Sequence, residues 1–198
     1  GHIIRFKEAG HTATAKTFAW DIFLFGAEED MGDANLSGLT AKNAFSSPDG
    51  LWFSKATGIC WIQTDDGAFT DETNCMMLAA IPGQVGDGGK VTVKNKMVVG
   101  GTEQTGTQET FLGAALGEAK LRRFLVAPSG AEVTGITETA DGRTLFVNIQ
   151  PPGELSKPLS SGAAPQSVWP GNQGYGVAGR PRSATIVITR KDGGVIGL

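Results

Sequence analysis

Two carboxylates lie beside predicted turns, where a side chain held in one place could bind a metal ion. Asp49 belongs to the turn Ser47-Pro48-Asp49-Gly50 and directly precedes the apolar run Leu51-Trp52-Phe53. Because Pro presets φ and Gly tolerates positive φ, this turn would fix the carboxylate at the mouth of a strand. Carboxylate oxygens are the ligands that hard cations such as Ca²⁺ prefer. The residues alone favour a simpler role for Asp49, which is to accept hydrogen bonds within its own turn.

Glu132 is the second candidate, and it lies between small residues and an apolar run in the segment Gly130-Ala131-Glu132-Val133-Thr134-Gly135. A charge in such surroundings is costly unless it has a partner. A metal ion or a buried Arg would serve as this partner, and the residues leave both readings open. Asn43 is a weaker candidate for binding a metal or lining a site, because an amide at a loop end is more often a cap or turn residue.

The remaining polar clusters lack the spacing that known catalytic or metal-binding motifs require. The acids within 28–33 do not follow the pattern of an EF-hand calcium loop, so we interpret them as a solvated loop. Asp65 and Asp66 predict a solvated turn. Arg122 and Arg123 could bind phosphate, but neighbouring residues of a strand face opposite ways, so at most one points inward. The two histidines lack metal-ligand spacing, and the sequence contains neither a nucleotide-binding P-loop nor a discernible Ser/His/Asp set.

Two predicted β-hairpins of similar layout position the candidate carboxylates. Residues 46–66 contain a turn, a short apolar strand, a second Gly-containing turn and a longer apolar strand. Residues 132–150 repeat this order around Asp141-Gly142, and Asp-Gly between apolar runs is a strong hairpin signal. Repeated antiparallel units of this kind indicate blades of a β-propeller, in which a hairpin mouth can face the central channel. We therefore predict that Asp49 and Glu132 approach each other on the channel side.

Composition indicates a β-rich globular chain. The 198 residues are 40% hydrophobic and 19% charged, and 29 are Gly, about twice the usual share. The glycines fall between short apolar runs, which indicates many turns and an all-β fold. The formal net charge of −3 gives no electrostatic reason to expect a nucleic-acid partner. No run approaches the roughly 18 apolar residues of a membrane span. Cys60 is interpreted as a buried thiol, and a disulfide with Cys75 is not required.

The other segments complete the prediction, with helix confined to one stretch. Apolar or alternating runs predict strands at 2–6, 18–25, 76–80, 91–99, 121–126 and 183–189. Gly-bearing polar stretches predict loops at 82–89 and 100–107, and residues 109–119 contain the only plausible short helix. Residues 151–182 are rich in Pro, Gly and Ser, so we expect an irregular surface excursion there.

Several motifs, taken in their order along the chain, resemble one known family. They are GHIIRF at 1–6, WDIF at 20–23, NAFSSPDGLWF at 43–53, WIQTDDG at 61–67, LRRFLVAPSGAEVTG at 121–135, DGRTLFVNIQPPGE at 141–154 and GRPRSATIVITRKDGGVIG at 179–197. Together they resemble the C-terminal part of the PhoX-type alkaline phosphatases. The resemblance runs from end to end of the chain.

The resemblance implies a fold and an activity for the whole family. It implies a six-bladed β-propeller that hydrolyses phosphate monoesters with Ca²⁺ and Fe³⁺ ions in its central channel. It also implies export, usually by the twin-arginine route, to the periplasm or the outside of the cell. By this resemblance Asp49 and Glu132 become metal ligands, with Asn43 as a further metal or site-lining residue.

The chain resembles about the last third of the family's full length, which changes what we expect of it. We expect one segment, 1–198, cut from a longer protein and forming a partial β-propeller of two to three blades of antiparallel strands. The family's N-terminal half, which carries a cysteine iron ligand, lies outside this sequence. We therefore expect little or no phosphatase activity from the chain alone, so whether it is itself an enzyme stays open. Its expected partners are the remaining propeller blades or a second copy, together with the substrate of the intact enzyme.

Two other functions remain alternatives to the phosphatase. One is a non-catalytic module of β-propeller type that serves binding or assembly. The other is a propeller hydrolase of the lactonase type, because hairpins with an Asp-Gly turn before a Trp-Phe pair also occur in that class.

Overall fold

The computed structural model describes residues 1–67, 71–171 and 180–198, which divide into two compact units. Unit 1 comprises Gly1–Ala44 and Pro82–Lys120, and unit 2 comprises Phe45–Ile81 and Leu121–Leu198. The regular structure is almost entirely β-strand, arranged in three sheets. The one α-helix of the described residues, α1 (Gly117–Lys120), has four residues, and the 3₁₀ helices at Ala9–His11, Gly32–Ala34 and Leu159–Ser161 have three each. The predicted β-rich fold class is therefore confirmed.

None of the helices in the part of the chain that the structure describes has the length and the hydrophobicity that a membrane span requires.

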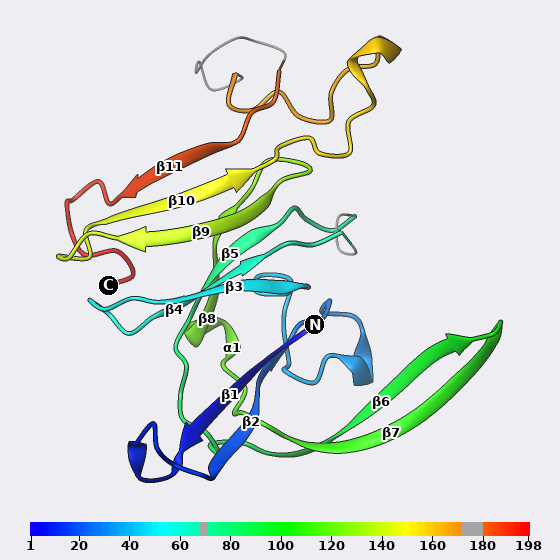
Figure 1. Ribbon diagram of the computed structural model, residues 1–198, viewed down its shortest axis with the longest axis vertical. Coiled ribbons are helices and arrows are strands. Elements are labelled where there is room, and N and C mark those ends of the chain that lie inside the picture. Colours follow the sequence, from blue (N-terminus) through cyan, green and yellow to red (C-terminus); the bar gives the residue numbers. More distant parts are fainter. Residues whose placement is uncertain (68–70, 172–179) are drawn as a thin grey trace. The chain divides into compact units, whose positions relative to one another are not determined.

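Unit 1 is built on a four-stranded sheet of order β1-β2-β7-β6 (Figure 1). Two antiparallel hairpins form this sheet, and a parallel bridge between Ile22 and Leu112 joins them. Both bridging residues are buried, so the two hairpins meet inside the unit. The strands are β1 (His2–Glu8), β2 (Phe18–Phe25), β6 (Gly89–Val99) and β7 (Thr102–Leu112).

The β6–β7 hairpin corrects two sequence predictions. The sequence predicts a loop at 100–107 and a helix within 109–119, yet β7 runs from Thr102 to Leu112 and α1 begins only at Gly117. Gly100 and Gly101 adopt positive φ values of 56° and 81°, which suit the two-residue turn between the strands. Almost all of β7 is exposed, so its sequence carries no alternation of buried and exposed side chains. The sequence signal for this hairpin was the Gly100-Gly101 dipeptide, which is typical of a two-residue hairpin turn.

An ion-pair network ties the β1–β2 hairpin to the loop that precedes β6. Arg5 Nε donates to Asp21 Oδ1 at 2.6 Å, and Arg5 Nη2 donates to Asp21 Oδ2 at 2.9 Å. Arg5 Nη2 also donates to Asp87 Oδ1 at 2.5 Å. Asp21 is 1% exposed, and its Oδ2 accepts the backbone N–H of Gly86 at 2.8 Å. Because charge-assisted bidentate pairs are strong, this network fixes the loop against the hairpin.

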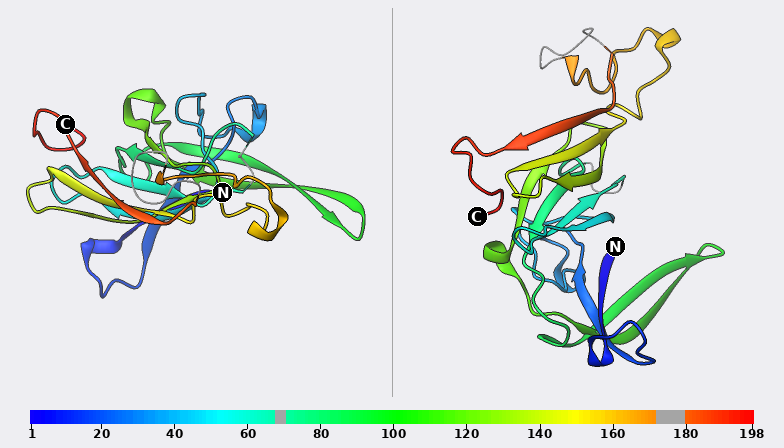
Figure 2. Two further views of the ribbon diagram at one scale, coloured as in Figure 1. Left: turned by 90° about the horizontal axis from the view of Figure 1, so that it is seen from above. Right: turned by 60° about the vertical axis from the view of Figure 1, so that its left-hand side comes forward.

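Unit 2 contains two antiparallel sheets (Figures 1 and 2). The first has the order β3-β4-β5-β8, and the second has the order β11-β10-β9. Both predicted hairpins are present, as β3–β4 and β9–β10. The strands of the first sheet are β3 (Pro48–Phe53), β4 (Cys60–Thr64), β5 (Met76–Ala80) and β8 (Leu121–Val126). Those of the second are β9 (Glu132–Glu138), β10 (Thr144–Gln150) and β11 (Ala184–Thr189).

The core of unit 2 is formed by apolar side chains from both of its sheets. Trp61 and Met77 of the first sheet belong to one buried cluster with Val133 and Val147 of the second. In β10, side chains alternate between buried and exposed, as they do when one face of a sheet packs on a core. Trp61 is 1% exposed, and its ring lies 4.8 Å from the ring of Phe124 between centroids. Packing of sheet against sheet therefore stabilises this unit.

The segment predicted as a surface excursion, 151–182, is described only in part. Its described residues 151–171 contain turns and the 3₁₀ helix Leu159–Ser161. Residues 172–179 lie outside the described residues.

Candidate functional site

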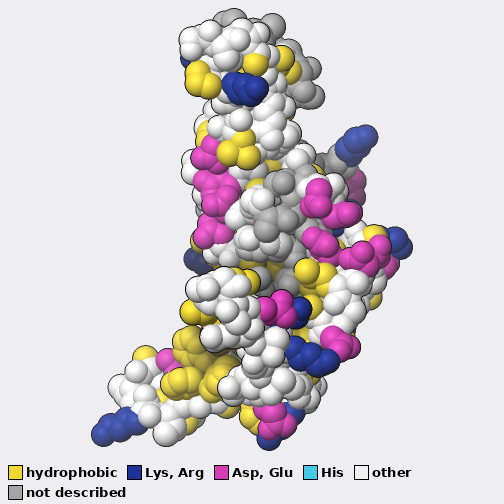
Figure 3. Space-filling model, turned by 90° about the vertical axis from the view of Figure 1, so that its right-hand side faces the viewer, with side chains coloured by type: hydrophobic (Ala, Val, Ile, Leu, Met, Phe, Trp, Pro, Cys, Tyr) yellow, Lys and Arg dark blue, Asp and Glu magenta, His cyan; other side chains and the backbone are white. Residues whose placement is uncertain are grey.

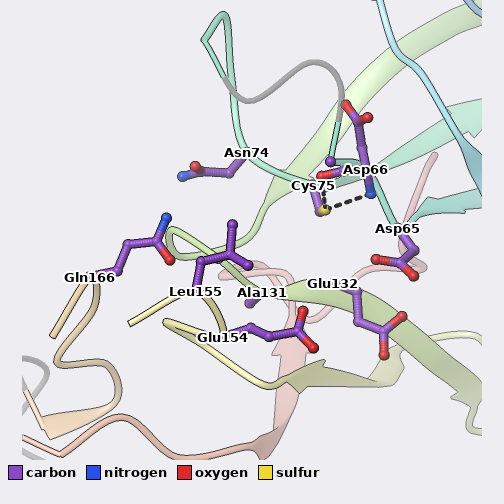
Figure 4. A pocket seen from close by; sticks show the side chains of 11 residues that line it. Asp65, Asp66, Asn74, Cys75, Ala131, Glu132, Glu154, Leu155 and Gln166 are labelled. Carbon is purple, nitrogen blue, oxygen red and sulfur yellow. Dashed lines mark hydrogen bonds between the residues drawn. The ribbon is translucent and has the colours of Figure 1, made fainter. Parts of the chain in front are cut away.

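A pocket of about 150 Å³ lies within unit 2, at the ends of strands from both sheets. Four segments line it: the residues after β4, those before β5, the turn into β9, and the irregular segment after β10. Figure 4 shows how their side chains surround the opening. The lining residues are Asp65, Asp66, Gly67, Asn74, Cys75, Gly130, Ala131, Glu132, Glu154, Leu155 and Gln166. The pocket therefore combines four carboxylates and two amides with apolar surface from residues such as Leu155 and Ala131.

Glu132, a residue proposed from the sequence, lies in this pocket as the first residue of β9. The antiparallel register pairs it with Gln150 of β10, and its Oε1 accepts a hydrogen bond from Gln150 Nε2 at 2.7 Å. This bond comes from a neutral amide, so it orients the carboxylate without neutralising its charge. A carboxylate offers about four lone-pair positions, so further positions remain for a cation.

Asp65 and Glu154 join Glu132 at the pocket, although neither was predicted to have such a role. In Figure 4 the carboxylates of these three residues lie on one side of the opening, whereas that of Asp66 points away. Asp66 has a structural role, because its Oδ1 accepts hydrogen bonds from Ser46 Oγ at 3.1 Å and Ser47 Oγ at 3.3 Å. The sequence signal for Asp65 was its place directly after an apolar strand. Polar groups that follow neighbouring strands can meet where those strands end.

Cys75 lines the same pocket, and its surroundings raise the pKa of its thiol. Burial is the main cause that raises the pKa of Cys75; the hydrogen bond from the Asp66 backbone lowers it in part, and the charges of Asp66 and Asp65 raise it further. Its Sγ accepts the backbone N–H of Asp66 at 3.1 Å. Cys60 is 2% exposed, and burial raises the pKa of its thiol to about 11. A raised pKa disfavours the thiolate, which is the nucleophilic form, at both cysteines.

Asp49 lies on the edge strand β3 and does not line the pocket. The pairing of β3 with β4 shifts between Pro48 and Leu51, so Asp49 and Gly50 together oppose the single residue Gln63. This is a β-bulge, which bends a strand and re-aims its side chains. A Cβ on Gly50 would lie 2.6 Å from Gln63 Oε1, so a larger residue here would require the Gln63 side chain to move. The result is an exposed Asp49 carboxylate on a locally fixed backbone.

Asn43 belongs to unit 1 and is used within its own turn. It is 1% exposed, and its Oδ1 accepts the backbone N–H of Thr40 at 2.8 Å. The backbone N–H groups of Asn43 and Ala44 in turn donate to the carbonyl of Thr40 at 2.9 Å and 2.8 Å. This is the turn role that the sequence offered as the alternative for Asn43.

The pocket carries part of the donor set that a hard cation needs. Its carboxylate and amide oxygens suit Ca²⁺, which takes six to eight oxygen ligands. Among the described residues, however, no three His, Cys, Asp or Glu side chains gather closely enough to hold a metal ion. The residues present therefore fit a calcium-type site in chemistry and leave its ligand set incomplete.

The first comparison with known proteins defines the class. A family model described as "Alkaline phosphatase PhoX" matches residues 1–153, which is more than half of the chain. The chain therefore belongs to the PhoX alkaline phosphatase family.

A comparison with solved structures adds one particular relative. The chain is similar to the structure described as "Pseudomonas fluorescens PhoX in complex with vanadate, a transition state analogue", with 32% sequence identity and a TM-score of 0.63. The similarity covers 98% of this chain and 27% of the Pseudomonas chain, so this chain spans about a quarter of that relative's length. A search of curated proteins found no match.

Proposed function

We propose that the chain is the C-terminal part of a metal-dependent phosphatase that hydrolyses phosphate monoesters. One observation carries the proposal: 98% of the chain is similar in fold, at 32% identity, to part of a PhoX that binds vanadate. In that Pseudomonas complex, vanadate serves as a transition state analogue. Because this chain spans 27% of that protein, the complete activity and its substrate remain part of the proposal.

We extend the proposal to architecture. The three sheets would be blades of a six-bladed β-propeller, and the remaining blades would be the partners of this chain. Support comes from the sheets, which have three or four strands each. The strands within each sheet pair mainly in antiparallel fashion, and the described residues contain almost no helix. A propeller site is lined by several blades, so one part of the ring would supply an incomplete ligand set, as this pocket does.

Glu132 and Asp49 are the proposed metal ligands. Gln150 would hold the Glu132 carboxylate in one orientation, and the bulge at Gly50 would hold Asp49. The family implies Ca²⁺ and Fe³⁺, and such ions supply charge neutralisation at a transferring phosphoryl group. The carboxylates of this chain would then fix the position of charge in the site rather than transfer protons.

The proposal also covers activity and location. By itself the chain would have little or no phosphatase activity, because a catalytic metal site needs its full ligand set in fixed geometry. Export to the periplasm or out of the cell is proposed from family membership.

A segment exchange tests the proposed function directly. The matching part of the Pseudomonas enzyme would be replaced by this chain, and hydrolysis of a chromogenic phosphate ester would be measured with Ca²⁺ and Fe³⁺. We expect vanadate-inhibited activity. Asp49→Asn and Glu132→Gln should each lower it by more than about 100-fold, since even outer-shell partners of metal ligands contribute 10- to 100-fold.

The matched control is Glu103→Gln, which makes the same chemical change at an exposed residue of β7. It should leave the activity of the exchanged enzyme unchanged. An exchanged enzyme that is active and equally tolerant of Asp49→Asn and Glu132→Gln would refute the ligand roles. If the exchanged enzyme folds but is inactive, the result would instead favour the alternative that this chain is a non-catalytic binding or assembly module.

A further inference from the structure

The strand β11 lies at the edge of its sheet without the features that usually protect a free edge. Its residues, Ala184–Thr189, are all uncharged and include neither Pro nor Gly. Its pairing with β10 has no register shift, so no bulge twists the edge away. Charged side chains are scattered over the face of the molecule in Figure 3, so their absence from this strand is local. An open, regular and uncharged edge of this kind is a template for pairing with another strand.

The other edge strands of the described sheets all carry charge. These edges are β1 and β6 in unit 1, and β3, β8 and β9 in unit 2. Lysines occur in β1 and β6, β8 contains two arginines, and β9 contains two glutamates. The strand β3 combines Asp49 with Pro48 and a bulge. Charges, Pro and bulges all discourage a further strand from pairing, so β11 is the edge that is left open to one.

The backbone of β11 has polar groups that point out of the sheet. The N–H of Thr139, directly after β9, donates to the carbonyl of Thr144 at 3.0 Å, so the backbone groups of Thr144 face β9. Because this direction alternates along an antiparallel strand, those of Leu145 face β11, where Leu145 is paired with Ile188. The same alternation turns every second residue of β11 outward, and in the described part of the chain no backbone group bonds to them there. The outward residues are Thr185, Val187 and Thr189.

The core of unit 2 is also incompletely covered at this edge. Ile186 and Ile188 pack against the core but are only partly buried. The residues that follow β11 do not cover them from the edge, because the N–H of Ile196 donates to the carbonyl of Gly142 at 2.9 Å, beside the β9–β10 turn. A further strand next to β11 would place apolar side chains beside Ile186 and Ile188 and bury more of their surface.

We infer that the free edge of β11 binds one further strand, supplied by the part of the phosphatase polypeptide that lies outside this chain. The sheet of β9, β10 and β11 has three strands, whereas each of the other two sheets has four. One added strand would bring this sheet to four strands, which is the usual number in a propeller blade. The inference deepens the proposed function and rests on it, because it names where part of the remaining polypeptide binds.

Strand number and chain length favour the rest of the same protein over a second copy of this chain. Two copies paired through β11 would form one sheet of six strands, which is larger than either four-stranded sheet here. The similarity covers 27% of the Pseudomonas chain, so about three quarters of a protein of that length remains to supply the strand. In strand addition the backbone provides affinity and alternate side chains provide specificity. The added strand should therefore carry apolar residues at every second position, on the side that continues Ile186 and Ile188.

The test is hydrogen exchange resolved to single amides, compared between the purified chain and the exchanged enzyme described above. The amides of Thr185, Val187 and Thr189 should exchange at least about 100-fold more slowly in the exchanged enzyme, because each would donate to the added strand. Those of Ile186 and Ile188 face β10 and should be protected in both proteins. Outward amides that exchange equally fast in both folded proteins would overturn the inference.

Two valine-to-proline variants of the exchanged enzyme form a matched pair. Val187→Pro removes an outward N–H, and Pro is tolerated on an edge strand where this N–H faces solvent. Val98→Pro makes the same change on the edge strand β6, one residue before the pair that closes its two-residue turn, where the N–H also points outward. Val187→Pro should lower the protection of Thr185 and Thr189 more than tenfold, and Val98→Pro should leave it within about twofold. Equal effects of the two variants would contradict a strand bound at β11.

A second measurement applies if the exchanged enzyme does not fold. The purified chain is then mixed with overlapping peptides that together cover the rest of the Pseudomonas sequence. One peptide should slow the exchange of the three outward amides, and no effect from any peptide at about 1 mM would overturn the inference. Protection that appears in the purified chain alone and grows with its concentration would assign the edge to a second copy and overturn it as well.

Phosphatase activity of the exchanged enzyme separates this inference from the proposed function. An active enzyme with unprotected outward amides would overturn the strand inference and leave the proposed function standing. An inactive enzyme in which these amides are protected would support the added strand and count against the proposed activity.

Discussion

The two units of the chain bury their sheets to different degrees. In unit 2 the two sheets pack on each other, and Trp61, Met77, Val133 and Val147 lie in one core with exposures of 1% or less. In unit 1 the single sheet leaves Phe6, Phe18 and Trp20 on a solvent-facing side. A sheet is stable when at least one face is buried against another layer.

The units therefore depend on different interactions. Unit 2 gains most from apolar burial, which is non-directional and tolerates exchanges of similar volume. Unit 1 depends more on the Arg5–Asp21–Asp87 network, whose bonds require particular atoms at particular distances. Substitutions should distinguish the two units, because core residues matter more in one and charged residues in the other.

The largest effect should come from paired tryptophan substitutions. Trp61→Ala should lower the free energy of unfolding of unit 2 by about 3–5 kcal/mol, since it leaves a cavity in a packed core. Trp20→Ala removes a side chain that is 46% exposed and should cost less than about 1 kcal/mol. Urea denaturation of both variants measures the difference. Equal losses would mean that unit 1 buries Trp20 against another layer in solution.

The next largest effect should come from Arg5→Met, which removes the cation from the network. Asp21 would keep a buried carboxylate without its ion-pair partner, and breaking a buried pair in this way costs about 3 kcal/mol. Denaturation of unit 1 should shift, while that of unit 2 should not. The double variant Arg5→Met with Asp21→Asn is the control, and it should recover part of the loss. If the double variant recovers none of the lost free energy of unfolding, the loss comes from packing of the Arg5 side chain instead.

A smaller effect should appear as acid sensitivity of unit 1. Burial raises the pKa of Asp87, but backbone N–H groups of Ala114 and Gln84 together with Arg5 lower it more, to about 2 from 3.8. The folded pKa lies below the unfolded value, so the carboxylate stabilises the fold above about pH 4. This contribution is lost as the pH falls from about 4 through 2. Denaturation at stepped pH values should find this loss, and Asp87→Asn should remove that part of the pH dependence.

The smallest effect should come from the exposed ion pair of Lys96 and Glu103. Their side chains are 71% and 56% exposed, so solvent screens the attraction. Lys96→Ala should change the free energy of unfolding by no more than about 0.5 kcal/mol. Compared with Arg5→Met, this variant separates the effect of burial from that of charge alone. A loss as large as that of Arg5→Met would contradict the expected dependence on burial.

Local sequence signals predicted the fold where one side of a hairpin is buried. Both hairpins of unit 2 combine a Gly turn with apolar runs, and both formed as expected. Prediction failed at β7 because almost all of it is exposed, so no hydrophobic period marks it. The pairing of Ile22 with Leu112 and the order of strands in each sheet depend on contacts between distant segments, which one sequence does not reveal.

The candidate site was predicted in part for the same reason. Glu132 stood out because a charge between small and apolar residues needs a partner, and it does line the pocket. Asp65 directly follows an apolar strand, which was a local signal, but its meeting with Glu132 and Glu154 depends on contacts between distant segments. Arg5 and Asp87 are 82 positions apart, so their contact also depends on the completed fold. The ligand roles of Asp49 and Glu132 stay a prediction until they are measured.

The contrast between Trp61 and Trp20 also gives each unit its own optical signal. The indole of Trp61 is 1% exposed and is tilted against Phe124, so its emission should lie at short wavelength and its near-ultraviolet circular dichroism should be strong. The indole of Trp20 is 46% exposed, so its emission should lie further to the red and should be quenched readily by a soluble agent. In a variant that lacks Trp52 and Trp169, fluorescence recorded at the two edges of the emission band would then follow the unfolding of unit 2 and of unit 1 separately.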